Sequence, residues 1–126
     1  MGNVHPNGLA IDAFIHFYYI IRDTRRDFVE LLYHEFAVLD WNGTELYGRE
    51  AIKNHCTALP PSRHHLTSVD CVYLQMNESP NIKLYHVIIG GEVTLGGEAV
   101  RNFNHNYLFS IENDIWQVIL DYYRES

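Results

Sequence analysis

Four long β-type segments in the second half of the chain constrain the fold most. They cover residues 64–75, 82–95, 100–111 and 115–124. The short stretches "MNESPN", "GGE" and "END" separate them, and all three are rich in turn-forming residues. Long strands joined by short turns pair antiparallel with their neighbours in the sequence. The pattern therefore predicts a four-stranded meander.

Two helices are expected at the start of the chain. Apolar residues recur at helical spacing through residues 9–22. Thr24 with Asp27 three positions later resembles a capping box, which would open a second helix. The apolar face of this second helix would consist of Phe28, Leu31 and Leu32.

A short hairpin and a third helix follow. Asn42-Gly43 lies between the β-rich run "EFAVLDW" and the return strand "TELYG", and both residues tolerate the positive φ angles of a type I′ turn. Alternation along the first strand places Asp40 on one face and its neighbour Trp41 on the other, where the indole ring of Trp41 would fill the interior. We therefore interpret Trp41, Asn42 and Gly43 as structural residues. The run "REAIKNHCTAL" then forms a helix that Pro60 ends.

The order of elements predicts one α+β domain over residues 1–126, with three helices on one face of an antiparallel sheet. Several strands are apolar on both faces. In the last strand, Trp116, Val118, Leu120 and Tyr122 would point to one side. The helices can cover one face of the sheet, and an uncovered apolar face normally belongs to a protein interface. The alternative is a sheet that curls and buries more of itself.

The charge balance argues against nucleic acid as a direct partner. The chain has 16 acidic and 9 basic residues, for a formal net charge of −7, whereas nucleic-acid binding needs clustered bases. The sequence shows neither a secretory signal nor a membrane-spanning run. We accordingly expect an intracellular protein in which Cys56 and Cys71 are reduced core thiols.

The residue types raise two kinds of chemistry, a metal site and proton-transfer catalysis. The eight histidines lack metal-ligand spacing, so no metal site is predicted. A small isomerase or dehydratase would need a carboxylate base facing a tyrosine or a protonated acid. The residues that could supply such a site are Tyr18, Tyr19, Asp40, His86, His105, Asp121 and Tyr123. The sequence pattern predicts that aromatic side chains fill that pocket, so catalysis is the less favoured hypothesis.

Six sequence runs occur in the order known from one protein family. They are "FIHFYYIIRDTRRDFVELLY", "DWNG", "YGREAI", "LPPSRHHLTSVDC", "IIGGEVTLGGEAVRNFNHNYLF" and "WQVILDYYR", and they span about residues 14–124. In these runs the chain resembles nuclear transport factor 2 (NTF2) and, more closely, the NTF2-related export proteins. The resemblance implies the NTF2-like cone, with three helices packed on one face of a curved, mostly antiparallel sheet. It also places Trp41 at the position that holds the base in ketosteroid isomerase-like sequences.

The resemblance also implies a partner. Family members pair through the sheet face with the NTF2-like domain of an mRNA export receptor of the NXF (TAP) type. We therefore expect a non-enzymatic, cofactor-free heterodimer subunit that supports mRNA export through the nuclear pore. It would shuttle between nucleus, pore and cytoplasm and reach Phe-Gly nucleoporins through the complex. The alternative is a homodimeric import factor for Ran-GDP, but that factor has an acid in a W-E-G turn where this chain has Asn42.

The implied partner interface centres on Arg124 in "DYYR", which matches a family arginine that forms a salt bridge with an aspartate of the receptor. Val87 and Asn106 match dimer positions on neighbouring strands. Strand alternation extends the set, and the predicted interface residues are Arg124, Tyr122, Leu120, Val87, Tyr85, Ile89, Asn104, Asn106 and Leu108.

Overall fold

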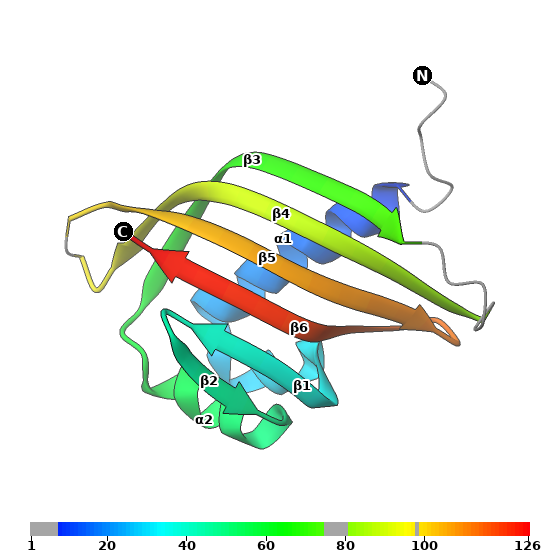
Figure 1. Cartoon of the computed structure of the whole chain (residues 1–126). Helices are drawn as coiled ribbons and strands as arrows, with labels where there is room; N and C mark the ends of the chain where they lie inside the picture. The colour runs from blue at the N-terminus through cyan, green and yellow to red at the C-terminus, as the bar shows by residue number, and fades with distance from the viewer. Residues whose placement is uncertain (1–7, 75–80, 98) are drawn as a thin grey trace.

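The computed structural model describes residues 8–74, 81–97 and 99–126 of the chain. Its elements follow the predicted order (Figure 1). They are α1 (Gly8–Thr24), the 3-10 helix η1 (Arg26–Leu32), β1 (Tyr33–Trp41), β2 (Thr44–Tyr47), α2 (Arg49–Ala58), β3 (Ser62–Leu74), β4 (Ile82–Leu95), β5 (Arg101–Glu112) and β6 (Ile115–Glu125). The predicted strand end at residue 75, residues 76–80 of the predicted turn "MNESPN" and Glu98 of the predicted turn "GGE" lie outside the described residues.

The strands form one curved six-stranded sheet in the order β2-β1-β6-β5-β4-β3 (Figure 1). Strands β3 to β6 make the predicted antiparallel meander. Strand β1 joins β6 in parallel, and β2 pairs antiparallel with β1, so the sheet is mixed. This arrangement confirms the predicted α+β cone with a mostly antiparallel sheet.

The hydrophobic core lies between the helices and one face of the sheet. Helix α1 runs across that face behind β4 and β5, while α2 and η1 pack near β1 (Figure 1). Ile15 and Tyr18 from α1 and Ile52 and Cys56 from α2 are fully buried there. Cys71, in contrast, is exposed, so the prediction of two core thiols is correct for Cys56 alone. Among the described helices, none is long and apolar enough to cross a membrane.

The second helix differs from its prediction. It is a 3-10 helix, and Thr24 belongs to the end of α1, where its hydroxyl donates to the Ile20 carbonyl. The predicted capping box is therefore wrong. Three-residue spacing also changes the buried face. Val29 and Leu32 are buried, whereas 65% of Leu31 is exposed.

The predicted hairpin turn is present. Asn42 and Gly43 have φ angles of 51° and 93°, as a type I′ turn requires. The Asn42 backbone N–H donates to the Tyr123 carbonyl oxygen at 2.8 Å, and the Glu125 N–H donates to the Asn42 side-chain oxygen at 2.8 Å. The turn is therefore fastened to the end of β6.

A β-bulge at Ile119 reverses the alternation of inward and outward side chains between the two halves of β6. Leu120 pairs with Leu108 of β5, but the next pair is Val118 with Phe109, so Ile119 is an extra residue. As a result, Val118 is buried in the core while 48% of Leu120 is exposed on the other side. The prediction that Trp116 and Val118 share a face with Leu120 and Tyr122 is wrong.

Candidate functional site

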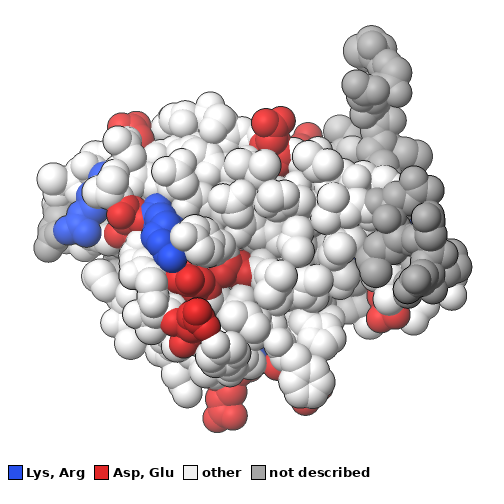
Figure 2. Space-filling model, in the orientation of Figure 1, with Lys and Arg blue, Asp and Glu red and all other residues white. Residues whose placement is uncertain are grey.

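One face of the sheet has no helix over it in the part of the chain that the structure describes. We call it the open face, and Figure 2 shows it from outside, with largely uncharged side chains across its middle. Four of its apolar residues, Val72, Ile88, Leu120 and Tyr122, are between 41% and 48% exposed. They come from β3, β4 and β6. An apolar surface of this kind is typical of an interaction site.

Six of the predicted interface residues lie together on this face. Cross-strand pairing places Asn104 beside Arg124, Asn106 beside Tyr122 and Leu108 beside Leu120. The two strands β5 and β6 therefore supply a compact block at the centre of the sheet. The contact of these six residues with a partner remains a prediction.

The three predicted interface residues of β4 lie on the opposite face. Tyr85, Val87 and Ile89 are at most 1% exposed and belong to the core. Their neighbours His86 and Ile88 face outward, where they pair with Leu108 and Asn106 of β5. Side chains alternate along a strand, so matching Val87 to the interface shifted the whole strand by one residue. The assignment of these three residues to the open face is wrong.

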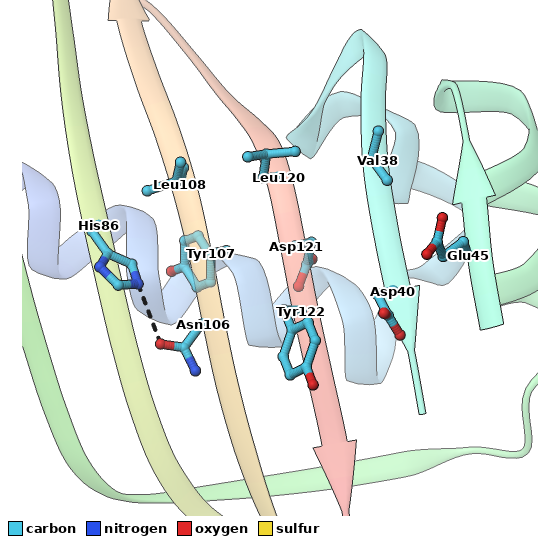
Figure 3. Close-up of a pocket in the computed structure, with 10 residues that line it drawn as sticks. All are labelled: Val38, Asp40, Glu45, His86, Asn106, Tyr107, Leu108, Leu120, Asp121 and Tyr122. Carbon is cyan, nitrogen blue, oxygen red and sulfur yellow. Dashed lines mark hydrogen bonds between the residues drawn. The ribbon is translucent and has the colours of Figure 1, made fainter. Parts of the chain in front are cut away.

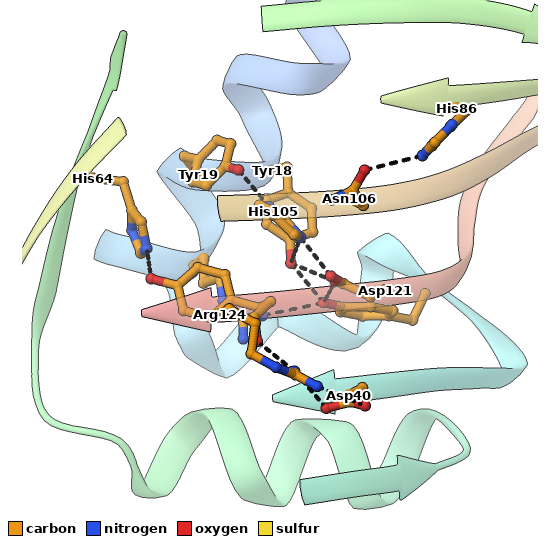
Figure 4. Close-up of polar contacts among 12 residues, drawn as sticks. Tyr18, Tyr19, Asp40, His64, His86, His105, Asn106, Asp121 and Arg124 are labelled. Carbon is orange, nitrogen blue, oxygen red and sulfur yellow. Dashed lines mark hydrogen bonds and ion pairs between the residues drawn. The ribbon is translucent and has the colours of Figure 1, made fainter. Parts of the chain in front are cut away.

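Arg124 and Asp40 form an ion pair on the open face (Figure 4). The two guanidinium nitrogens Nη1 and Nη2 donate to the two carboxylate oxygens at 2.7 and 3.3 Å. The Gly43 N–H also donates to Asp40, and the guanidinium carbon lies 3.9 Å from the centre of the Tyr122 ring. The hydrogen bond between the partners raises the pKa of Arg124 and lowers the pKa of Asp40. Both groups therefore stay charged and neutralise each other.

This pairing was not predicted from the sequence. The sequence pattern places Asp40 beside a structural hairpin turn and Arg124 at the partner interface, and neither assignment indicates that the two side chains meet. Strand alternation could have indicated it, because alternation places both residues on the outer side of strands that the fold makes adjacent. Asp40 pairs directly with Tyr122 across the parallel β1–β6 ladder, next to Arg124.

The open face contains a hollow of about 350 Å³ between β1, β5 and β6 (Figure 3). Its lining residues are Val38, Asp40, Glu45, His86, Asn106, Tyr107, Leu108, Leu120, Asp121 and Tyr122. The side chains of Tyr107 and Asp121 are buried on the other side of the sheet, so these two residues form the floor. The His86 ring nitrogen Nε2 lies 3.2 Å from the Asn106 side-chain oxygen at one end.

A polar network fills the interior on the helix side (Figure 4). The hydroxyls of Tyr18 and Tyr33 each donate to Asp121 Oδ2 at 2.6 Å. The His105 ring contacts the other carboxylate oxygen through Nε2 and the Tyr19 hydroxyl through Nδ1. All of these groups are buried, so every hydrogen bond operates in a medium of low polarity.

The protonation states follow from these contacts. Burial alone would raise the pKa of Asp121, but His105, Arg22 and the Tyr18 hydroxyl outweigh it and lower the pKa. Burial lowers the pKa of His105, against the pull of Asp121. The neutral His105 ring then donates from Nε2 to Asp121 and accepts at Nδ1 from Tyr19. Arg22 balances the carboxylate charge, 3.1 Å from the Tyr33 hydroxyl and 4.2 Å from the Trp41 ring.

The catalytic candidates are therefore split between the two faces. Tyr18, Tyr19, His105, Asp121 and Tyr123 meet in the interior. The other two, Asp40 and His86, line the hollow on the open face. A carboxylate does lie inside the cone, but its lowered pKa and its occupied oxygens do not suit a proton-transfer base.

The interior is also closed by aromatic packing. Trp41 is 7% exposed and stacks on Tyr123 with ring centres 3.8 Å apart. His64 joins this group from β3, with Nδ1 2.6 Å from Asp23 and Nε2 2.9 Å from the Tyr123 hydroxyl. Within residues 8–74, 81–97 and 99–126, no group of three or more His, Cys, Asp or Glu side chains is arranged to hold a metal ion.

Comparisons with known proteins agree with this architecture. Among solved structures, nuclear transport factor 2 of Cryptosporidium parvum superimposes with a TM-score of 0.80 and 21% identity over 98% of both chains. The yeast deubiquitinase Ubp3 and Bre5 cofactor complex gives a TM-score of 0.78 with 16% identity, over 98% of both chains. At these identities the similarity establishes the fold.

Sequence relatives are more specific. NTF2-related export protein 1 of Bos taurus is 30% identical over 119 residues, which cover 91% of this chain and 85% of the relative. NTF2-related export protein 2 of Homo sapiens is 31% identical, over 91% of this chain and 84% of the relative. Residues 10–124 match the family model of the nuclear transport factor 2 (NTF2) domain. The chain therefore belongs to the NTF2 domain family, among the NTF2-related export proteins.

Proposed function

We propose that this chain is a non-enzymatic subunit of nuclear transport that pairs through its open face with the NTF2-like domain of an NXF/TAP-type receptor. The pair would support export of mRNA, and the chain would move between nucleus, nuclear pore and cytoplasm. The relatives named as export proteins support the transport role. The observation that supports pairing through this face is the exposure of the apolar residues Ile88, Leu120 and Tyr122.

The composition of the open face suits a dedicated partner. Stable interfaces combine an apolar centre with a polar, hydrogen-bonding rim. Here Leu108 and Leu120 face each other across β5 and β6, while Asn104 lies beside Arg124 at the end of the block. A partner sheet with matching groups would bury the leucines and satisfy the amides. Through that pair the complex, rather than this chain alone, would contact Phe-Gly nucleoporins.

The interior supports a non-enzymatic role. The carboxylate of Asp121 already accepts hydrogen bonds from two tyrosines and contacts His105, and the Trp41 ring is buried against Tyr123 in the same interior. We interpret the network as a structural device that fixes β5, β6 and α1 to one another.

Arg124 has a more precise part in this proposal than the sequence implied. Asp40 holds two of its nitrogens, and the Tyr122 ring supports one side of the guanidinium. An arginine has five N–H donors; Asp40 accepts from two of them and the Tyr123 carbonyl oxygen from a third, so a partner carboxylate can bind the donors that remain. Asp40 then acts as a positioning residue that holds the guanidinium in one orientation before the partner arrives.

Co-expression with an NXF/TAP-type NTF2-like domain tests the proposal, with the mass measured by light scattering. The expected result is a 1:1 complex that Leu120→Asp abolishes and Leu31→Asp leaves intact. Leu31 is a matched control because it is 65% exposed on η1, away from the open face. A homodimer that ignores the receptor, or a complex that tolerates Leu120→Asp, would refute the proposal, and binding of Ran-GDP would then be measured.

A charge-reversal variant tests the part of Arg124 separately from that of Leu120. Arg124→Glu should weaken the complex by about 2 kcal/mol or more, roughly thirtyfold, because it places like charges beside Asp40 and the partner's carboxylate. Arg25→Glu is the control, since Arg25 is exposed on the helix side and paired with Asp27. Equal affinities for the two variants would remove Arg124 from the interface.

A further inference from the structure

We propose that the hollow on the open face receives one basic side chain, an arginine or a lysine, from the partner domain. The inference rests on the proposed function, because it describes the surface of the partner that would cover this face. It concerns a different contact from Arg124, which offers a cation to the partner. Here this chain offers an anion, and Figure 3 shows the residues that surround it.

The shape of the hollow suits a long side chain with an apolar stem. Its volume of about 350 Å³ is at the small end of the range for ligand pockets, about 300–1,000 Å³. Val38, Leu108 and Leu120 form its apolar wall, on three different strands (Figure 3). Arginine and lysine bury their methylene stems against such a wall while the charged end reaches a polar group.

The charge of the hollow selects a cation. Its lining contains three acids and neither lysine nor arginine. Asp40 is neutralised by Arg124, and the Asp121 carboxylate is buried beneath the sheet within its own network. Glu45 is the acid that remains: the Tyr47 hydroxyl donates to its Oε2, and within the described residues no cation is paired with it. A basic side chain lying in the hollow would form an ion pair with the Glu45 carboxylate.

The position of Glu45 fixes the direction of the incoming side chain. Glu45 pairs with Asp40 across the β1–β2 ladder, so it lies at the β2 side of the hollow. His86 and Asn106 are hydrogen-bonded to each other at the β4 side (Figure 3). The stem would therefore enter over Leu120 and Val38 and point its charged end toward β2.

A second copy of this chain meets this requirement poorly. The basic residue on the central block of the face is Arg124, and Asp40 and Tyr122 hold its guanidinium against the surface of its own chain, where a carboxylate can approach it but from which it does not extend into the hollow of a facing copy. Two facing copies would also bring two net-acidic surfaces together, since Arg124 neutralises Asp40 on each copy and the charge of Glu45 remains. A partner whose sheet face presents an unpaired arginine or lysine fits the charges better.

The complex with an NXF/TAP-type NTF2-like domain gives the first test. Glu45→Gln keeps the shape of the side chain and removes its charge, and we expect it to weaken binding by about tenfold or more at low salt, with a smaller effect at high salt. Glu35→Gln, an exposed glutamate of β1 that lies outside the hollow, is the matched control. Equal affinities of the two variants would overturn the inference.

A small probe tests the hollow even if no receptor binds, so the inference and the proposed function can fail separately. N-acetyl-arginine amide is titrated into the wild-type chain while the methyl resonances of Val38, Leu108 and Leu120 are followed by NMR. N-acetyl-citrulline amide, which has nearly the same shape without the charge, is the comparison. Saturable shifts with the arginine probe that Glu45→Gln removes are expected. Equal responses to both probes, or no response at these methyls, would overturn the inference.

Discussion

Replacing Asp121 by asparagine should destabilise the fold more than any surface change of the same kind. Asp121 is 3% exposed and Arg22 is 2% exposed, so both charges are held away from water. Asparagine has almost the same shape, but it removes the negative charge and turns one hydrogen-bond acceptor into a donor. Arg22 would then be a buried cation without a counter-charge, and one donor among Tyr18, Tyr33 and His105 would lose its acceptor.

The size of the effect can be estimated. Leaving a buried charge without its counter-charge costs about 3–5 kcal/mol, a large part of the 5–15 kcal/mol that stabilises a typical domain. For a chain of 126 residues, a loss of this size should lower the melting temperature by about 10–20 °C. Asp70→Asn is the matched control, because Asp70 is exposed on β3, and it should change stability by no more than about 0.5 kcal/mol.

Urea denaturation followed by circular dichroism measures these free energies. The double variant Arg22→Met/Asp121→Asn should be more stable than Asp121→Asn alone, because it removes the uncompensated charge, and a double-mutant cycle gives the coupling energy. The reasoning is refuted if Asp121→Asn matches Asp70→Asn within about 1 kcal/mol. It is also refuted if removing Arg22 brings no recovery, since the cost would then come from the lost hydrogen bonds.

Three further perturbations have defined outcomes. Because burial lowers the pKa of His105 and of His55 below 6.5, the unfolded chain binds protons that the folded chain does not, and the free energy of unfolding should fall as the pH drops below about 6.5. Urea titrations at pH 7.0 and 5.5 check this, and an unchanged midpoint would contradict it. Gly91→Ala would place a Cβ atom 2.2 Å from the His65 carbonyl oxygen, so thermal unfolding should show a loss of about 1–3 kcal/mol. Deleting Ile119, the unpaired residue of the bulge, leaves Val118 beside Phe109 and Leu120 beside Leu108 on their present faces, so it should lower the melting temperature far less than deleting Asn106 from the regular strand β5, which would turn half of that strand to the wrong face; similar melting curves for the two deletions would argue against the bulge.

Local sequence patterns were sufficient for the order of the elements. The long β segments and the Asn42-Gly43 turn have strong local signals, and the structure has the meander and hairpin that they predict. The parallel pairing of β1 with β6 has no local signal, because it joins residues more than 80 positions apart, such as Asp40 and Tyr122. The Arg124–Asp40 ion pair depends on that pairing and was therefore missed.

The assignment of side chains to one or the other face of the sheet was wrong where an extra or wrongly matched residue changed the alternation. Alternation predicts faces correctly within a regular strand, but a bulge adds one residue and reverses every side chain beyond it. Ile119 does this in β6, and no residue type at that position reveals it in advance. In β4 the strand itself is regular, and the error came from matching Val87 to the interface; the outward residues are His86 and Ile88.

The interior network shows why a correct set of residues can lead to a wrong role. Polar side chains within apolar segments, such as Tyr18, His105 and Asp121, are the residues that a catalytic site would need, and the fold does bring them together. What decides the role is the number of hydrogen bonds that each one has already made. That number depends on side chains from four elements and is not visible in any one segment.

Strand β6 connects the interior network to the open face. Asp121 points into the network, while its neighbours Leu120 and Tyr122 point outward to the proposed partner. The network holds the backbone of β6 at this point, so it also fixes the positions of the two outward residues. A change at Asp121 should therefore weaken pairing through lost stability, whereas Leu120→Asp should weaken pairing with the urea midpoint nearly unchanged. Measuring both quantities for both variants separates a residue that holds the interface in place from one that contacts the partner.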